Sequence, residues 1–284
     1  MANEFPAIWF DTFLSPATAA PVDRELGFIQ RHLPLAHYPR LLDVPCGIGR
    51  HAGPLAKLGY DVVGADRSES ALASARRDYP EAEYRKADLF DLAALNTTFD
   101  AVLCLWHSFG YGNSDQNRRV LDDMRRIVRP GGRILLDLYN AEAAAQLPLV
   151  ATETRGGRTV TTRRSWLGRR LRVELEYSES AGIDTHEWEV YTPSEITHLA
   201  REVNLSLVLC CAWFDEMIPP SADHLRMQLL LERSTDHQVL TQAVVKGVRS
   251  NEIVEAVRPA VRSYAAGCNS YRSSDVKVLD GPAA

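Results

Sequence analysis

Short apolar runs alternate with helical patterns over the first half of the chain. The runs cover residues 40–44, 61–65, 100–105 and 133–138, with a shorter strand expected at 83–86, and helical patterns cover 49–58, 70–77 and 114–128. Continuous apolar runs of this length are typical of parallel strands that are buried on both faces. The regular exchange of strand and helix predicts an α/β domain whose doubly wound parallel sheet carries helices on both faces.

The pattern changes after residue 150, where apolar and polar residues alternate along 171–177. A period of two is typical of a half-buried antiparallel strand. A strand at 159–166 and a turn at Leu167-Gly168 precede it, so a hairpin is expected, and a further strand is expected at 186–191. These strands predict a small antiparallel sheet that caps the domain.

The remaining patterns suggest five segments along the chain. A helix is expected at 21–32, another at 193–203, and strands at 205–212 and 225–232. We expect an N-terminal lid over 1–38, a core over 39–150, an antiparallel β cap inserted over 151–191, the remainder of the core over 192–233, and a C-terminal helical tail with a disordered end over 234–284. Helices at about 238–248 and 251–265 are expected in that tail.

Composition excludes several classes of protein. The 284-residue chain has a net charge of -5, which argues against a general binder of nucleic acid or anionic membranes. No run of 18 apolar residues occurs, so no membrane helix is expected, and the N-terminus lacks the pattern of a signal peptide. The five cysteines have no metal-like spacing, and free thiols in the cytoplasm are the simplest account. Asp137 and Asn140 are only a partial ligand set, so no metal is expected.

A glycine-rich loop follows the first apolar run. Gly47, Gly49 and Ala52 fit a common dinucleotide-binding spacing, which alone is weak evidence. Asp43 precedes this loop, and its carboxylate would repel a pyrophosphate but attract an ammonium group. The loop therefore favours S-adenosylmethionine (SAM), which carries an ammonium and a sulfonium, over NAD.

Asp66 ends the second apolar run, about twenty residues after the loop. A carboxylate at this place can accept hydrogen bonds from both ribose hydroxyls of a nucleoside. Asp66 could instead be an acid near a helix N-terminus. Because it follows a correctly placed glycine loop, the ligand-binding interpretation is favoured.

Four stretches in order resemble the motifs of class I SAM-dependent methyltransferases, whose fold is Rossmann-like. They read LLDVPCGIGRHAGPLAKLGYDVVGADRSESALASAR, KADLFDL, FDAVLCLWHSFGY and VRPGGRILLDLYN. The resemblance covers about 40–140 strongly and continues to about 233 more loosely, which implies a sheet of about seven strands. It implies that the methionine part of SAM lies near Asp43, Cys46, Gly47 and Gly49, the ribose at Asp66, the adenine near Arg67, Asp88 and Leu89, and the methyl group near Leu105 and Trp106.

The inserted antiparallel strands and the SFGY stretch resemble bacterial small-molecule methyltransferases, including amino-sugar and glycine N-methyltransferases. In many of these, a tyrosine in an N-terminal tyrosine-aspartate pair closes over SAM. This chain has Trp9-Phe10-Asp11 instead, so the aromatic lid is kept without its hydroxyl. We expect Phe10 to contact SAM and Trp9 to contact the acceptor, although a helix packed on the core would also explain these residues.

His107 and Tyr111 are the candidate catalytic residues. Both follow the carboxyl end of the fourth strand, where open α/β sheets bind their ligands. His107 could act as a base and Tyr111 could orient the acceptor, while structural roles at a strand end remain the alternative. Acceptor-pocket walls are expected from the residues Trp188, Tyr191, Trp213 and Asp215. A basic run over 163–172 is opposed by nearby glutamates and predicts a cross-strand ladder of charges.

The sequence thus predicts transfer of the SAM methyl group to a small-molecule acceptor, favouring an amine nitrogen. An O- or C-methyltransferase and a SAM-consuming cyclase or lyase remain alternatives. A NAD-linked dehydrogenase and a non-catalytic SAM-binding protein are further ones. The expected partner is the acceptor alone, without nucleic acid or membrane, and a homo-oligomer is left open.

Overall fold

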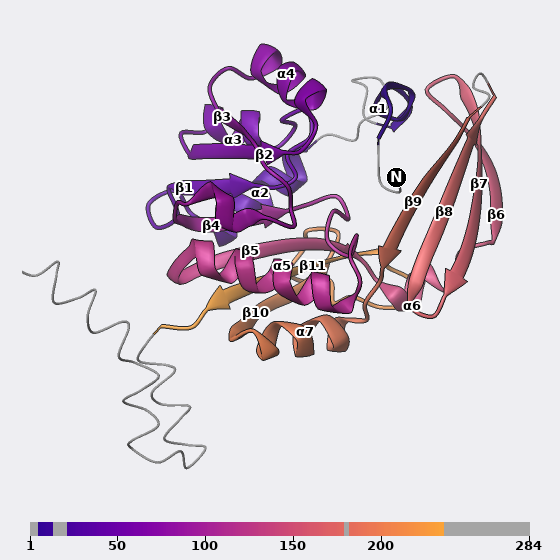
Figure 1. Cartoon of the computed structure of the whole chain (residues 1–284). Coiled ribbons are helices and arrows are strands. Elements are labelled where there is room, and N and C mark those ends of the chain that lie inside the picture. Colours follow the sequence, from indigo (N-terminus) through magenta and orange to yellow (C-terminus); the bar gives the residue numbers. More distant parts are fainter. Residues whose placement is uncertain (1–4, 14–21, 179–181, 236–284) are drawn as a thin grey trace, which may run out of the picture. The chain divides into compact units, whose positions relative to one another are not determined.

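A seven-stranded sheet forms the centre of the protein (Figure 1). The computed structural model describes residues 5–13, 22–178 and 182–235. In order across the sheet, the strands are β10 (Leu205–Ala212), β11 (Arg226–Arg233), β5 (Val128–Tyr139), β4 (Phe99–Cys104), β1 (Arg40–Asp43), β2 (Asp61–Asp66) and β3 (Glu83–Lys86). The first five strands in chain order pair in parallel, and β10 and β11 add an antiparallel edge. The predicted Rossmann-like α/β fold is therefore confirmed.

Helices cover both faces of this sheet. They are α2 (Asp23–His32), α3 (Ala52–Lys57), α4 (Glu69–Asp78), α5 (Ser114–Ile127) and α7 (Pro193–Glu202), with short turns η1 (Leu92–Leu95) and α6 (Ala141–Ala144). Local sequence sets where they start. Asn113 and Gln116 form a capping box before α5, Thr192 and Glu195 form another before α7, and Ser68 caps α4.

Successive residues of the central strands enter two different cores. Leu42 and Val63 belong to one buried cluster, whereas the neighbouring Leu41 and Val62 belong to the other. This alternation explains why the strands read as continuous apolar runs, because both of their faces are buried.

A second, antiparallel sheet contains β6 (Val150–Arg155), β7 (Arg158–Leu167), β8 (Arg170–Tyr177) and β9 (Ile183–Glu189). The predicted hairpin is present, since Leu167 pairs with Arg170 and Gly168 has a φ of +59° in the turn. Sequence analysis missed β6, because this edge strand is almost wholly exposed and shows no apolar alternation. It also expected β9 to start at 186 and end at 191, beyond its observed end.

A short N-terminal helix, α1 (Ala7–Phe13), lies against this second sheet (Figure 1). Its residues Ile8, Trp9 and Phe13 pack on the cluster of Val160, Leu175 and Tyr177. The described residues up to Ser234 belong to one compact unit, whereas the predicted tail helices lie outside the described residues. Within the described ranges, none of the helices is long and apolar enough to cross a membrane.

Candidate active site

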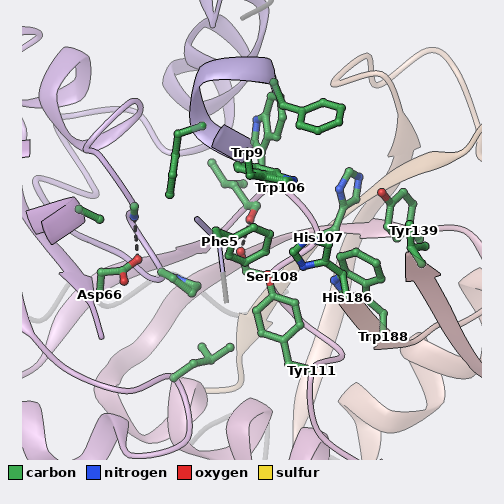
Figure 2. Close-up of a pocket in the computed structure, with 18 of the residues that line it drawn as sticks. Phe5, Trp9, Asp66, Trp106, His107, Ser108, Tyr111, Tyr139, His186 and Trp188 are labelled. Atoms are coloured by element: carbon green, nitrogen blue, oxygen red, sulfur yellow. Dashed lines mark hydrogen bonds between the residues drawn. The ribbon is translucent and has the colours of Figure 1, made fainter. Parts of the chain in front are cut away.

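One large cavity, with a volume of about 1020 Å³, is lined by both sheets and by α1. Its walls come from the loops after β1, β2, β3 and β4, from the inner face of β6–β9, and from the N-terminal aromatic residues. Figure 2 shows Asp66 on one side of this cavity and a cluster of aromatic rings on the other. The carboxyl ends of parallel strands are where open α/β sheets bind ligands, so this position fits an active site.

The glycine loop after β1 is held by β2. The Gly47 amide donates to Asp66 Oδ2 at 2.8 Å, and both Cys46 and Gly47 line the cavity. Gly47 has a φ of +53°, and a Cβ built there would meet nothing within 4 Å, so this side of the loop is open to a ligand. Gly49 (φ +81°) does not line the cavity; a Cβ there would lie 2.6 Å from the Tyr84 hydroxyl, so this glycine is required for packing.

Asp66 closes the strand β2 and faces the cavity. Its second oxygen accepts from the Ser68 amide at 2.8 Å, and the residue is 8% exposed. Burial raises the pKa of this carboxyl overall, although the two amide hydrogen bonds act in the opposite direction. Each oxygen retains capacity for a further donor. The predicted adenine neighbours Arg67, Asp88 and Leu89 line the same part of the cavity.

Asp43 lies behind the loop and does not line the cavity. Burial raises its pKa to about 6, and one of its oxygens, Oδ2, has no hydrogen-bond partner among the described residues. The Ala52 amide at the start of α3 lowers this pKa as a donor. A buried carboxylate oxygen without a partner is unfavourable, so a positive group in the loop would stabilise it.

The floor of the cavity is a strained turn after β4. Trp106 and His107 have φ values of +55° and +57°, a backbone conformation that residues other than glycine rarely adopt. Asp137 holds both residues: its Oδ2 accepts from the Trp106 amide at 2.9 Å, and its main-chain oxygen accepts from the His107 amide at 3.0 Å. The turn therefore presents Leu105, Trp106 and His107 to the cavity.

Asp137 is wholly buried, and its negative charge is balanced by an arginine on β11. Arg226 and Gln228 both donate to its carboxylate, Gln228 at 2.8 Å. Burial raises the pKa of Asp137, but the Arg226 charge, the nearby His107 and the hydrogen bonds from Arg226 and Gln228 together outweigh it, so the pKa is lowered. Sequence analysis considered Asp137 only as an incomplete metal ligand, because its partner on β11 is 89 residues away in the chain.

A buried acid on α2 extends this network beneath the floor. Glu25 contacts His51, Arg50 at 3.5 Å and Arg226 at 3.4 Å. Burial raises the pKa of Glu25, but the hydrogen bond with His51 and the nearby positive charges lower it overall. The guanidinium of Arg50 lies 4.0 Å from the centroid of the Trp106 ring, and that of Arg226 lies 5.1 Å from it. Both arginines line the cavity, and Glu25 and Asp137 beneath the floor balance their charges.

Aromatic rings form the opposite wall (Figure 2). His107 stacks on Tyr139 with centroids 3.8 Å apart, and Tyr139 meets Trp188 edge to face at 5.4 Å. His186 lies 5.8 Å from Trp188 and stacks on Phe5 at 4.6 Å. Burial lowers the pKa of both histidines to about 4, so both are neutral near pH 7.

The structure brings most of the sequence-predicted residues to this cavity; besides Asp43 and Gly49, three of them lie elsewhere. Trp9, Phe10, His107, Tyr111 and Trp188 line it. Tyr191, Trp213 and Asp215 do not. The Tyr191 hydroxyl donates to Glu189 at 2.9 Å beneath the wall, Trp213 is 43% exposed, and Asp215 pairs with Arg24 at 3.0 Å. Their expected place in the acceptor pocket was wrong. Trp213 and Asp215 follow β10, where the chain turns back to α2 rather than toward the second sheet, and the Tyr191 hydroxyl bonds to Glu189 instead.

Sequence analysis missed Phe5, Tyr139, His186 and Arg226, all of which line the cavity. Of these four, only His186 had a usable signal in the sequence. It lies two residues before Trp188 on β9, and residues two apart on a strand point to the same face of the sheet. The predicted charge ladder is present on the second sheet. Arg163 pairs with Glu176 at 3.1 Å, and Arg170 pairs with Glu187 at 2.9 Å.

Comparisons with known proteins agree with this geometry. Residues 41–132 match the family model of the methyltransferase domain. A demethylmenaquinone methyltransferase of Paenarthrobacter aurescens is 30% identical over 126 residues, covering 40% of this chain and 49% of that protein. A dTDP-3-amino-3,6-dideoxy-alpha-D-glucopyranose N,N-dimethyltransferase of Streptomyces fradiae is 33% identical over 168 residues, which cover 56% of this chain and 64% of that protein. The chain thus spans about half the length of the first curated relatives it matches.

Solved structures share the fold. A SAM-dependent methyltransferase from Clostridium acetobutylicum has a TM-score of 0.70 at 16% identity, covering 81% of this chain and 98% of that one. A SAM-bound amino pentose methyltransferase from Micromonospora echinaspora has a TM-score of 0.60 at 23% identity, and the match covers 76% of this chain and 93% of that one. Residues 41–132 are therefore similar to a methyltransferase domain, and the described part of the chain shares its fold with solved SAM-dependent methyltransferases.

Proposed function

We propose that the protein transfers the methyl group of SAM to a small-molecule acceptor, and that the acceptor atom is an amine nitrogen. One observation carries this proposal: a single cavity runs from Asp66 and the glycine loop to a ring-lined wall. A methyl donor at the first end and an acceptor at the second would share one enclosed space. Enclosure and orientation are the main requirements for transfer of an already activated group.

The residues at the first end fit SAM. Asp66 would accept the ribose hydroxyls, and the loop of Cys46 and Gly47, with Asp43 and Gly49 behind it, would hold the methionine part. Arg67, Asp88 and Leu89 would surround the adenine, Leu105 and Trp106 would lie near the methyl group, and Phe10 would cover the site. The open space at Gly47 and the unpartnered Asp43 oxygen support this fit. The chemistry supplied by bound SAM is a sulfonium methyl group.

The residues at the second end favour a neutral amine. His107 is uncharged near pH 7, and its buried Nε2 has no partner in the described part of the chain, so it could accept a hydrogen bond from an amine N–H. Burial raises the pKa of the Tyr111 hydroxyl, which keeps it a donor. An apolar cavity also disfavours the ammonium form of a bound amine, which cannot attack. We propose His107 and Tyr111 as catalytic residues, with Trp9 and Trp188 as acceptor walls.

A hydroxyl acceptor suits this site less well. An alcohol must lose its proton as it reacts, and a histidine whose pKa is about 4 is a weak base for that purpose. Two similar proteins are named as methylating nitrogen, the dTDP-3-amino-3,6-dideoxy-alpha-D-glucopyranose N,N-dimethyltransferase and a sugar N-methyltransferase from Streptoalloteichus, and they support the same preference. A ubiquinone biosynthesis O-methyltransferase of Cereibacter sphaeroides, 28% identical over 208 residues, keeps oxygen as the alternative.

Product analysis tests the proposal. The full chain is incubated with SAM and matched pairs of amines and alcohols, and the products are identified by mass spectrometry. We expect S-adenosylhomocysteine together with a methylated amine. Methylthioadenosine in its place would indicate a SAM-consuming cyclase or lyase, and a methylated alcohol from the matched pair would reassign the enzyme to oxygen.

A further inference from the structure

On β8 and β9, the inner face of the second sheet places His186 among the side chains of Leu171, Val173 and Trp188. Strand pairing places His186 opposite Val173 and Trp188 opposite Leu171, and all four line the cavity. Val173 and Leu171 offer no hydrogen-bonding group to the imidazole. His186 is 1% exposed, and the Phe5 ring stacks on one face of its imidazole.

Three buried polar atoms on this face have no hydrogen-bond partner within the described residues. They are both ring nitrogens of His186 and Nε1 of Trp188. A neutral imidazole has one donor and one acceptor nitrogen, and the indole adds a second donor. Buried polar groups are normally paired, so an unpaired set that faces a cavity indicates a ligand with complementary groups. Such a ligand needs both a hydrogen-bond donor and an acceptor.

The shape of this wall suits a flat molecule. His107 and Tyr139 are parallel within 3°, and Phe5 and His186 are parallel within 14°. Trp188 lies between these two stacked pairs, 5.4 Å from Tyr139 and 5.8 Å from His186. Flat faces and ring edges of this kind bind planar rings by offset or edge-to-face contact.

The charges around the cavity disfavour a cation at this wall. The described residues that line the cavity from the second sheet include two arginines, Arg155 and Arg164, and one carboxylate, Glu153. Arg50 and Arg226 at the floor are already paired with Glu25 and Asp137. Asp66 and Asp88 belong to the proposed cofactor end, and Glu153 is 3.4 Å from Arg155. A positively charged acceptor would thus gain little from these carboxylates and would be repelled by the arginines of the second sheet.

We infer that the methyl acceptor is a flat, uncharged, nitrogen-containing ring compound whose edge offers both a donor and an acceptor to His186 and Trp188. This inference rests on the proposed function, since it names the substrate class of the same site. His186 acts as a positioning residue that recognises the body of the acceptor, while His107 faces the reacting nitrogen.

Ligand-observed NMR titration tests this inference with three probes on the full chain, in the presence of saturating S-adenosylhomocysteine. The probes are 7-azaindole, which has a donor and an acceptor, indene, which has the same shape and neither group, and benzylamine, which is a cation near neutral pH. We expect 7-azaindole to bind about tenfold more tightly than the other two, as two hydrogen bonds would give. Equal affinities of 7-azaindole and indene for the unmodified protein would overturn the inference.

Variants separate recognition from structure. His186→Phe keeps a ring that can stack on Phe5, so indene should bind unchanged while 7-azaindole loses most of its advantage. His186→Asn keeps a hydrogen-bond donor and an acceptor, so this variant should keep part of the preference for 7-azaindole over indene. His198→Phe on α7 is the matched control, because His198 is exposed and does not line the cavity. An unchanged preference for 7-azaindole in His186→Phe would contradict the role of His186. If S-adenosylhomocysteine itself does not bind, the proposed function fails, whereas binding without probe preference rejects only the substrate class.

Discussion

The two ends of the cavity are built in different ways. At the cofactor end, the lining residues come from one stretch, 45–90, and main-chain amides of Gly47 and Ser68 fix the Asp66 carboxylate. At the acceptor end, the lining residues come from Phe5 through Trp188 and meet only because two sheets and α1 come together. A local motif therefore marks the proposed donor site, whereas the proposed acceptor site is a surface that no short motif contains.

The two regions also differ in how charge stabilises them. Under the floor, Asp137 is buried with Arg226 and Gln228 and holds the strained turn of Trp106. On the second sheet, the charged pairs are exposed to water, with Arg163 and Glu176 each 51% exposed. Buried pairs are costly to break, and exposed pairs contribute little. Substitutions in the two regions should therefore have very different effects.

The largest effect is expected at Asp137. Asp137→Ala leaves the Arg226 charge buried without its main partner and removes the acceptor of the Trp106 amide. We expect the free energy of unfolding to fall by about 3–5 kcal/mol, measured by urea denaturation. Asp122→Ala, in an ion-pair cluster on the surface of α5, is the control. A loss at Asp137 no greater than the loss at Asp122 would contradict the role assigned to the buried network.

An intermediate effect is expected from the buried histidines as the pH falls. Burial lowers the pKa of His186 to about 4, below its ordinary value of 6.5, so the unfolded chain binds more protons between these two values. This contribution to stability is complete above pH 6.5 and is lost as the pH falls toward 4. When the pH is lowered from about 7 to about 4.5, the free energy of unfolding of His186→Phe should fall by about 2 kcal/mol less than that of the unmodified protein. Parallel losses in urea denaturation at both pH values would show that His186 is not buried as a neutral group.

The smallest effect is expected on the charge ladder. Arg163→Ala breaks its 3.1 Å pair with Glu176 on the exposed face of β7 and β8. We expect a loss of less than about 1 kcal/mol in the free energy of unfolding, and less still at high salt. A loss comparable to that of Asp137→Ala would mean that the two regions do not differ as described.

The sequence predicted the parts of the molecule whose structure depends on local patterns. Apolar runs and cap residues identified the central strands and helices, and Cys46 and Gly47 of the predicted glycine loop line the cavity together with Asp66. The prediction failed where position depends on tertiary contacts. Strand β6 carries no apolar period, and Trp213 follows a strand but turns away from the cavity. His186 has no motif around it; its spacing of two residues from Trp188 and the pairing of β8 with β9 are what indicate that both face the same space.

The most direct test of the account is calorimetric titration with SAM, because the whole argument depends on Asp66 and the glycine loop forming the donor site. The unmodified chain is compared with Asp66→Ala and with Asp61→Ala, a control at the exposed start of the same strand. We expect micromolar binding by the unmodified chain, similar binding by Asp61→Ala, and binding weakened by about 100-fold in Asp66→Ala, as the loss of two charge-assisted hydrogen bonds would give. Equal binding by all three proteins, or no binding by the unmodified chain, would contradict the account.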